Sequence, residues 1–520
     1  MRRAALVLAL LLTTACGGGE EEPRTPPAEP PREIEVDASS TLYGFVGDTA
    51  GNPVEGVVVS DGFQCVATDA GGVYEMKRDA AAEYVCYSVP AEFKIRTGHD
   101  GYPDFYVRLD TSQQKIRQDF TLERLAGVER NFRLICIGDP QINEASHAVR
   151  FKEEAGREIR EYAASAGVPC YGITLGDHVN NKWTLFTNMV VALQPEQTGV
   201  PVFATIGNHD HEFPTADEKA ARAKYESYFG PVDYSFNRGD VHVVSMDNVI
   251  HSCKASADYE GGFTAAQYEW LKQDLSFVPK DKMVILCVHI PFRGGWGTNS
   301  AHADADKYYD EVLDLLSQYE YAAIMSAHTH SNINYIHRKN GKEIFEHVTG
   351  TTCGAWWRST VCTEGTPIGF GLYRIDDNRM EEWAYRSVRH DEQFQIRLYR
   401  ASDTFVGGAK YRFKQTGADQ IVANIWNWDP SWTVNVYEND VLSGQMTRNS
   451  DIDAWTVAYH IGLLNNTDSY RKSSDHMFHY TLKNPAAAVR VEAIDRFGNK
   501  YEQTVFTDPA EHPGDFHADF

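Results

Sequence analysis

The sequence predicts an α/β core with a β-sandwich on either side of it. In residues 126–388, apolar runs of strand length alternate with longer segments of helical spacing. Residues 41–125 and 389–520 instead show short strands separated by turn residues. A chain of 520 residues is also too long for one core, which favours several domains.

The first sixteen residues have the features of an export signal. Arg2 and Arg3 precede the apolar run 4–12, which is too short to span a bilayer, and small residues then lead to Cys16. Residues 13–16 resemble a bacterial lipoprotein box, although Thr13 stands where that box usually has a large aliphatic residue. The resemblance implies that Cys16 is acylated and becomes the N-terminus. The alternative is an ordinary secretory signal with a chance cysteine.

Residues 17–40 are polar and rich in proline, so they cannot bury a core and are predicted to be a disordered tether. The protein is therefore expected outside the cytoplasm, as a lipoprotein anchored to a membrane and facing the periplasm or the cell surface. Its net charge of -24 makes nucleic acid an unlikely main partner, because an acidic protein lacks a broad cationic face for phosphates.

The cysteines give a weaker signal. Outside the cytosol, Cys65 with Cys86 and Cys353 with Cys362 are close enough in sequence to suggest disulfides, although sequence alone does not settle the pairing. Cys136 and Cys287 lie in apolar runs and are expected to be core thiols.

The first β-sandwich is predicted in residues 41–125. Its expected strands include 43–46, 57–60 and 73–76, and turn residues such as Gly51, Asn52 and Pro53 separate them. The segment 44–62 resembles the transthyretin-type, regulatory-like modules that accompany many secreted hydrolases. No chemistry is expected there.

The core is predicted from apolar strands that helices cover on both faces. The expected strands are 132–137, 171–175, 202–206, 242–246, 283–288 and 322–325, and the expected helices are 151–166, 216–228, 265–277 and 305–319. Beyond this core, residues 432–436 and 489–493 indicate strands of the second sandwich.

Nearly every core strand ends in side chains that bind metals. The clusters are residues 138–141 (Gly-Asp-Pro-Gln), 176–178 (Gly-Asp-His), 207–210 (Gly-Asn-His-Asp), 289–291 (His-Ile-Pro) and 327–330 (Ala-His-Thr-His). Because functional crevices lie at the carboxyl ends of strands, these clusters are expected to converge. Each alone is explained by a turn, a helix cap or a core histidine. A row of five buried polar groups without a common purpose would be costly for the fold.

The order D-x-Q, G-D, G-N-H-D, H-x-P, H-x-H resembles that of the calcineurin-like metallophosphoesterases, over about residues 132–385. The resemblance implies a four-layer αββα core and two divalent ions, with Mn, Fe, Zn or Mg all compatible with these ligands. It implies that Asp177 bridges the ions, that Asp139 and His330 hold the first, and that Asn208, His289 and His328 hold the second. His209 would contact the phosphate, stabilising its charge or protonating the leaving oxygen.

One position departs from the family pattern. Family members usually have histidine where Gln141 stands, and an amide oxygen is a weaker ligand than imidazole for zinc-like ions. Gln141 is therefore kept as a candidate ligand, and the identity of the metal stays open.

The resemblance further implies hydrolysis of a phosphomonoester or a phosphodiester by a hydroxide that bridges the two ions. Residues beside the motifs are candidate substrate contacts: Asn143, Asn180, His211, Arg293, Trp296 and Trp356. For the tryptophans, packing between domains is an equal alternative. The competing function is a non-catalytic binding or scaffold protein built on a decayed phosphoesterase domain. The presence of Asp177, Asn208 and His209 opposes it.

Overall fold

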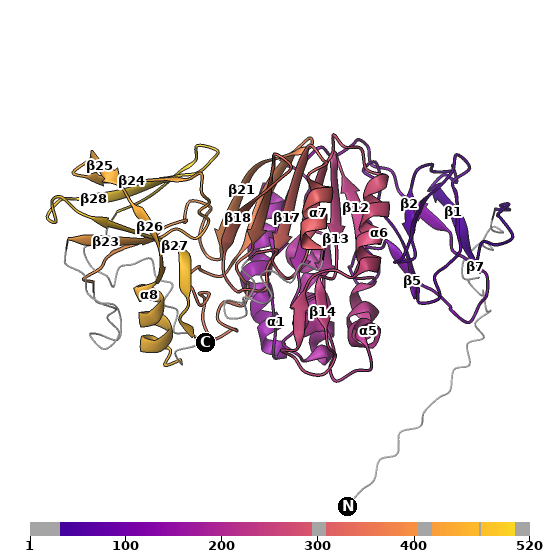
Figure 1. The fold of residues 1–520 in the computed structure, drawn as a ribbon, viewed down its shortest axis with the longest axis horizontal. Helices are drawn as coiled ribbons and strands as arrows, with labels where there is room; N and C mark the ends of the chain where they lie inside the picture. The colour runs from indigo at the N-terminus through magenta and orange to yellow at the C-terminus, as the bar shows by residue number, and fades with distance from the viewer. Residues whose placement is uncertain (1–31, 294–307, 404–418, 467–469, 505–520) are drawn as a thin grey trace, which may run out of the picture. The chain divides into compact units, whose positions relative to one another are not determined.

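The computed structural model describes residues 32–293, 308–403, 419–466 and 470–504 (Figure 1). Residues Val36–Phe520 form one compact unit, separate from Met1–Glu35. Cys16, most of the predicted tether and Trp296 lie outside the described residues. Among the residues that are described, no helix is long and apolar enough to cross a membrane.

The N-terminal domain consists of two four-stranded sheets, as predicted for this region. One contains β1 (Leu42–Asp48), β4 (Val73–Met76), β7 (Ile116–Arg117) and β8 (Phe120–Leu122). The other contains β2 (Val58–Ser60), β3 (Cys65–Ala67), β5 (Tyr84–Tyr87) and β6 (Tyr106–Arg108).

The suggested Cys65–Cys86 disulfide is wrong, because both thiols are free and buried. Ser60, on the strand between them, pairs with Cys65 on one side and with Cys86 on the other. The two cysteines are thus two strand spacings apart, about 9–10 Å. A disulfide needs Cα atoms no more than about 7 Å apart.

The core contains two sheets. The first has the order β11 (Val202–Thr205), β10 (Cys170–Leu175), β9 (Asn131–Ile137), β20 (Gly369–Asp376), β21 (Arg379–Ser387). The second has the order β12 (Tyr234–Arg238), β13 (Val241–Ser245), β16 (Met283–Cys287), β17 (Tyr321–Ser326), β19 (Lys342–Val348), β18 (Ile333–Lys339). A small ribbon of β14 (Val249–His251) and β15 (Tyr259–Gly261) accompanies them.

Alternate residues of β16 show how the layers pack. Ile285 and Cys287 belong to the apolar cluster shared with the first sheet, whereas Val284 and Leu286 belong to a second cluster with helices α6 (Ala265–Ser276) and α7 (Tyr309–Leu316). Because side chains alternate along a strand, this sheet is buried between the other sheet and the helices.

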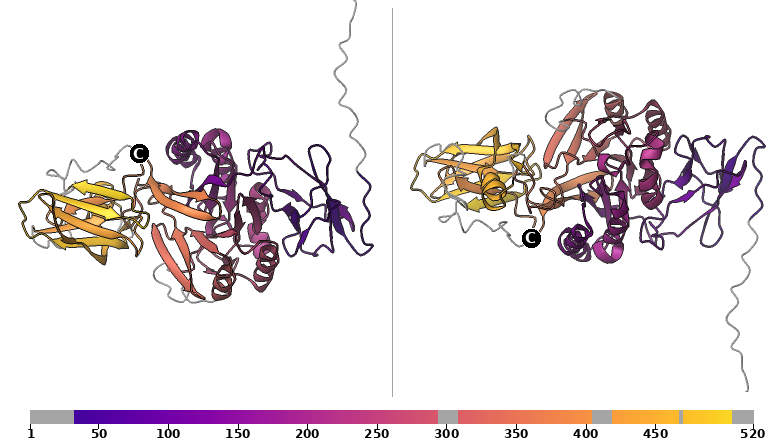
Figure 2. Two further views of the ribbon diagram at one scale, coloured as in Figure 1. Left: turned by 90° about the horizontal axis from the view of Figure 1, so that it is seen from above. Right: turned by 90° about the horizontal axis from the view of Figure 1, so that it is seen from below.

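Further helices cover the outer face of the first sheet. They are α1 (Ala145–Phe151), α2 (Arg157–Ser165), α3 (Phe186–Leu193) and α4 (Pro195–Thr198), with the π-turn η1 (Lys152–Gly156) between α1 and α2 and the short η2 (Trp183–Leu185) before α3. Figure 2 views many helices end-on, on the two outer sides of the paired sheets. The predicted four-layer αββα fold class is confirmed.

Some core elements differ from the prediction. The first helical segment begins at Ala145, earlier than expected, and α5 (Glu218–Phe229) begins after its cap, Asp217. Strands β18 to β21 had no counterpart among the expected strands. Strand β20 pairs antiparallel with β9, whereas β10 pairs with β9 in parallel.

The C-terminal domain again contains two four-stranded sheets. One is β22 (Arg397–Arg400), β23 (Gln420–Asn424), β27 (Ser473–Thr481) and β26 (Thr447–Ile452). The other is β25 (Val441–Gln445), β24 (Thr433–Glu438), β28 (Val489–Ile494) and β29 (Lys500–Thr504), and α8 (Ala454–Val457) with η5 (Ala458–Leu463) packs beside them.

The suggested Cys353–Cys362 disulfide is also wrong, because these two buried thiols are free. The hydroxyl of Thr351 lies between them, 3.7 Å from the sulfur of Cys353 and 3.6 Å from that of Cys362.

Candidate metal centre

The five polar clusters come together, but from two sheets rather than one. Strands β9, β10 and β11 run parallel in the first sheet, and β16 and β17 run parallel in the second. Their carboxyl ends face a common space, so residues as far apart in sequence as Asp139 and His328 are in contact. The backbone N–H of His328 donates to Oδ2 of Asp139 at 3.0 Å.

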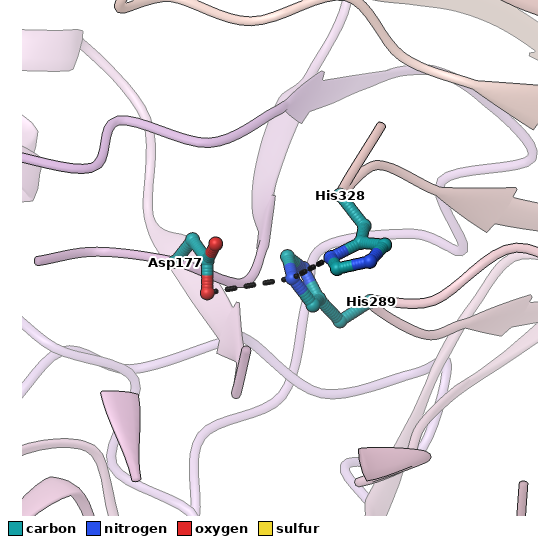
Figure 3. A group of neighbouring side chains, drawn as sticks. All are labelled: Asp177, His289 and His328. Carbon is teal, nitrogen blue, oxygen red and sulfur yellow. Dashed lines mark hydrogen bonds and ion pairs between the residues drawn. The ribbon is translucent and has the colours of Figure 1, made fainter. Parts of the chain in front are cut away.

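Two groups of potential ligand atoms share one residue. The first group is Asp177, His289 and His328, and the second is Asp139, Asp177 and His330 (Figure 3 shows the first). Within each group the ligand atoms all lie within 4.8 Å of one another, and every residue is buried. Asp177 belongs to both groups.

Hydrogen bonds orient the imidazole of His289. Its Nδ1 lies 2.7 Å from the carbonyl oxygen of Leu175, so Nδ1–H donates to the backbone. Nε2 is then left facing the site, 2.9 Å from Oδ1 of Asn208 and 3.4 Å from Oδ1 of Asp177. This is the tautomer that a metal ligand requires.

The two histidines of the last cluster present different nitrogens. Nδ1 of His328 is 3.1 Å from Nε2 of His289, and its own Nε2 is 3.4 Å from the hydroxyl of Tyr259. Nε2 of His330 lies 3.7 Å from Oδ1 of Asp139. No pattern in the sequence pointed to Tyr259.

The backbone is strained around these side chains. Asp139, Gln141, Asp177, His328 and His330 all have positive φ, between 35° and 65°. Such conformations cost about 1–3 kcal/mol each for residues other than glycine and concentrate at functional sites. The surrounding fold therefore holds the ligand side chains in place against a local penalty.

Two glycines allow the loops to approach one another. Gly176 has a φ of 93°, and a Cβ there would overlap the ring of His289. A Cβ on Gly207 would overlap the backbone nitrogen of Asp177. The glycine in each of these motifs is thus required by close packing.

The electrostatics fit a bound cation. Burial raises the pKa of Asp139 well above its usual value, and the charge of Asp177 adds to the effect. Burial opposes ionisation of Asp177 as well, but His289 and His209 outweigh it and hold its pKa below the usual range. Burial lowers the pKa of His330 to about 3, which keeps that imidazole neutral. Burial also opposes a charge on His289, but Asp177 outweighs it and raises the pKa of that imidazole to about 9. Two buried carboxyl groups beside imidazoles form a donor set suited to a divalent metal, whose charge would take the place of the proton on His289.

Two buried oxygen atoms support the same conclusion. Oδ1 of Asp139 and Oε1 of Gln141 are buried and accept no hydrogen bond. The amide nitrogen of Gln141 donates to Oδ2 of Asp177 at 3.1 Å, which fixes its oxygen on the other side. Buried acceptors without a donor are costly, and a cation would satisfy both. The residues present therefore fit a metal site.

His209 lies at the edge of the site. Its side chain is 24% exposed, its backbone N–H donates to Oδ1 of Asp177 at 2.8 Å, and its Nε2 is 4.0 Å from Oδ2 of that residue. Nδ1 is 2.9 Å from Oδ1 of Asn181, whose amide nitrogen donates to Ser256. Asn181 was missed in the sequence, although it directly follows the predicted Asn180.

Asp210 links its own cluster, residues 207–210, to the cluster at residues 176–178. Its carboxylate accepts from the backbone N–H groups of His178, Val179 and Gly207 and lies 2.9 Å from Nδ1 of His178. His178 is fully buried. Asp210 and His178 thus hold the loops that carry Asp177 and Asn208 in fixed register.

The predicted substrate contacts lie in different places. His211 is fully buried with both ring nitrogens near protein acceptors, Gly207 and Asp247. Asn143 is exposed, and Asn180 is half-buried with its backbone N–H donating to Ile142. Arg293 is exposed, with its guanidinium over the ring of Tyr335.

Of the described candidates, Trp356 packs against a proposed ligand, with its ring tilted by 34°. Its ring centroid is 5.0 Å from that of His330. The next residue, Trp357, donates through its indole N–H to the carbonyl oxygen of Pro140, at 2.8 Å. Pro140 stands between Asp139 and Gln141, so the two tryptophans contact two different ligand loops.

Comparison with known proteins agrees with this geometry. Residues 132–332 match the model of the calcineurin-like phosphoesterases, residues 40–125 match that of the N terminal of calcineurin-like phosphoesterase, and residues 346–501 match that of its C terminal. Together the three matches cover most of the chain.

Individual relatives are distant. Purple acid phosphatase 23 of Arabidopsis thaliana is 26% identical over 181 residues, 32% of this chain and 36% of that protein. Purple acid phosphatase 18 of the same plant is 25% identical over 182 residues, 33% of this chain and 38% of that protein. The matched segment thus spans little more than a third of these curated relatives.

Among solved structures, the purple acid phosphatase PPD1 from yellow lupin (Lupinus luteus) seeds matches 51% of this chain and 52% of its own, at 14% identity and a TM-score of 0.36. The family models carry the assignment. The chain belongs to the calcineurin-like phosphoesterases, of which it has the N-terminal, catalytic and C-terminal domains.

Proposed function

We propose that this protein is a hydrolase that cleaves a phosphomonoester or a phosphodiester at a site for two divalent ions. One observation carries the proposal: two buried groups of ligand atoms share Asp177. A carboxylate that belongs to both groups is suited to hold two cations close together. The plant relatives, which are purple acid phosphatases, favour the same chemistry.

In this proposal Asp139 and His330 would hold one ion, Asn208, His289 and His328 would hold the other, and Asp177, which belongs to both groups of ligand atoms, would serve each of them. Gln141 offers its unpartnered oxygen on the side of Asp139. Ions bound at such a site lower the pKa of a coordinated water and offset the charge of the phosphate. Mn, Fe, Zn and Mg all remain compatible with this set of ligands.

His209 is the residue of this chain proposed to act on the leaving group. Its Nδ1 side is occupied by Asn181, so its Nε2 is the nitrogen that faces the site. From there it would donate a proton to the leaving oxygen or stabilise charge on the phosphate. Its backbone N–H, held by Asp177, fixes the ring relative to the ligand loops.

Hydrolysis of two chromogenic esters tests this function. A protein beginning at Glu33, just before the compact unit, would be assayed with p-nitrophenyl phosphate and bis-p-nitrophenyl phosphate in Mn, Fe, Zn and Mg. We expect activity that is lost on chelation and in Asp177→Asn but kept in Asp217→Asn, a carboxylate that caps α5. Inertness toward both esters with every metal would favour the binding or scaffold alternative.

We further propose that Cys16 is acylated and anchors the protein on the outer side of a bacterial membrane. The motif at residues 13–16 and the polar tether support this proposal. Full-length protein would be expressed in bacteria with labelled palmitate. Label and membrane association should both be lost in Cys16→Ser, and label retained in that variant would contradict the proposal.

A further inference from the structure

An aromatic chain leads from the metal centre into the C-terminal domain. Trp356, beside His330, meets the ring of Tyr470 edge-on, with centroids 5.6 Å apart and planes at 82°. The ammonium of Lys472 lies 6.0 Å from the centroid of Trp356. Tyr470 and Lys472 precede β27, so both belong to the C-terminal domain. The wall next to His330 is therefore built by two domains.

The segment that carries these residues is firmly attached. The backbone N–H of Lys472 donates to the carbonyl oxygen of Thr363 at 3.1 Å. The carbonyl oxygen of Tyr470 lies 2.8 Å from Nδ1 of the buried His460, whose Nε2 is 2.7 Å from the hydroxyl of Ser359. These bonds fix Lys472 and Tyr470 to the loop between β19 and β20, residues 349–368.

That loop is joined in turn to the H-x-H motif. The carboxylate of Glu364 accepts from the backbone N–H of Asn332, two residues after His330, at 3.0 Å. The side-chain amide of Asn332 donates to the carbonyl oxygen of Trp426 in the C-terminal domain at 2.8 Å. The position of Lys472 relative to His330 is therefore held through a short series of buried hydrogen bonds.

The charge of Lys472 lies near the metal centre. Its ammonium is 6.0 Å from the ring centroid of Trp356, and the ring of His330 is 5.0 Å from the same centroid. Burial lowers the pKa of Lys472 to about 8, so the group still carries its charge at neutral pH. The buried carboxylate of Glu364 opposes this lowering and helps to keep the ammonium charged. A cation at this place attracts an anionic oxygen that approaches Trp356.

We propose that Lys472, supplied by the C-terminal domain, binds an anionic oxygen of the substrate beside Trp356 and makes the site selective for phosphomonoesters. The inference rests on the proposed function. A monoester phosphate carries about two charges near neutral pH and a diester carries one. The attraction to a fixed ammonium is therefore about twice as large for the monoester. Trp356 and Tyr470 would contact the organic group.

The test is a comparison of two substrates across Lys472 variants of the protein that begins at Glu33. kcat and KM would be measured for p-nitrophenyl phosphate and for bis-p-nitrophenyl phosphate in one metal. Lys472→Met should lower kcat/KM for the monoester by about tenfold or more and for the diester by about threefold or less. Lys472→Arg, which keeps the charge, should stay within about threefold of the wild type.

Lys483→Met is the matched control, because Lys483 is an exposed lysine of the same domain. It should leave both substrates unchanged. The inhibition constant of inorganic phosphate should rise in Lys472→Met and not in Lys483→Met. Equal effects of Lys472→Met on both esters, or no effect, would overturn the proposal.

Two further observations keep the outcome interpretable. If Lys472→Met does not fold, the salt dependence of the wild type decides, because KM should rise more steeply with ionic strength for the monoester than for the diester. A wild type that hydrolyses neither ester contradicts the proposed function itself. A wild type that is active but shows no selective loss contradicts only the role of Lys472.

Discussion

Nδ1 of His209 lies 2.9 Å from the side-chain oxygen of Asn181, and the amide nitrogen of Asn181 donates to Ser256 at 3.0 Å. Because the amide nitrogen is used by Ser256, the oxygen must face the imidazole, and Nδ1 carries the proton. Asn181 also has a φ of 55°, so its position is maintained at some backbone cost. It is a positioning residue for His209.

Removing this contact should impair turnover. Asn181→Ala is expected to lower kcat for the activated ester by about 10- to 100-fold while changing KM little, as for other residues that orient an active imidazole. Asn435→Ala is the control, because the side-chain amide of Asn435 donates to Glu492 within the C-terminal domain. Steady-state kinetics on both variants check this, and equal losses would count against the orienting role.

Asp210 is expected to be essential for stability. Asp210→Ala leaves three backbone N–H groups and the ring of His178 without their buried acceptor. The free energy of unfolding should fall by about 3 kcal/mol or more. Asp217→Ala, which removes only the cap of α5, should cost about 1 kcal/mol. Urea denaturation of both variants measures the difference, and similar losses would contradict this account of Asp210.

Bound metal should stabilise the fold. Chelation is expected to lower Tm by about 3 °C or more, because buried Asp139 and Asp177 lose the cation that offsets their charges. Adding back a divalent ion should restore Tm. Scanning calorimetry with and without chelator checks this. In Asp177→Asn the chelator should have little further effect, and an unchanged Tm in the wild type would speak against resident ions.

Gln141 is expected to bind zinc-like ions more weakly than a histidine at the same position would. Gln141→His replaces an amide oxygen with imidazole and is expected to slow the loss of zinc to a competing chelator by about tenfold. Gln141→Ala should accelerate that loss. Metal retained after dialysis, measured by elemental analysis, checks the order. If the three proteins retain zinc equally, Gln141 is not a ligand.

Acid should destabilise the core partly through His347. Burial lowers the pKa of this histidine to about 3, against about 6.5 in the unfolded chain. As pH falls below 6.5, the unfolded chain gains a proton that the folded one does not, so stability is lost. Between pH 7.5 and 5 the loss is about 2 kcal/mol.

His347→Gln should remove this part of the pH dependence, even if the variant is less stable overall. The exposed His99 provides the control, since His99→Gln should keep the dependence of the wild type. Urea midpoints at the two pH values measure it. An unchanged slope in His347→Gln would show that the ring becomes protonated while folded.

Much of the core could be predicted because its parallel strands are buried on both faces. Residues 171–175 and 283–288 are continuous apolar runs, and the structure places β10 and β16 over nearly the same residues. The polar clusters were found for the same reason, since a carboxylate or imidazole directly after such a run stands out. The rule that parallel strands end at one side predicted convergence within one sheet, but it did not predict that two sheets would bring the clusters together.

The edge strands could not be predicted in this way. Strand β18 is mostly half-buried and carries Arg338 and Lys339, so it lacks an apolar run. The division into two sheets depends on β20 pairing with β9 from more than two hundred residues away. Contacts made only in space, such as Tyr259 with His328 or Lys472 beside Trp356, leave no local pattern. The separation of Cys65 from Cys86 likewise reflects strand order, which spacing does not reveal.

The place of β9 has a consequence for synthesis of the chain. One side of β9 is covered early by β10, but its other partner, β20, is made much later, after the whole second sheet. At ordinary translation rates this delay is on the order of tens of seconds. Through that interval the apolar edge of a half-built sheet is available for wrong pairing. A nascent chain of this protein should therefore depend on chaperones until about residue 387 has emerged, and nonsense truncations before β20 should aggregate rather than yield a smaller folded protein.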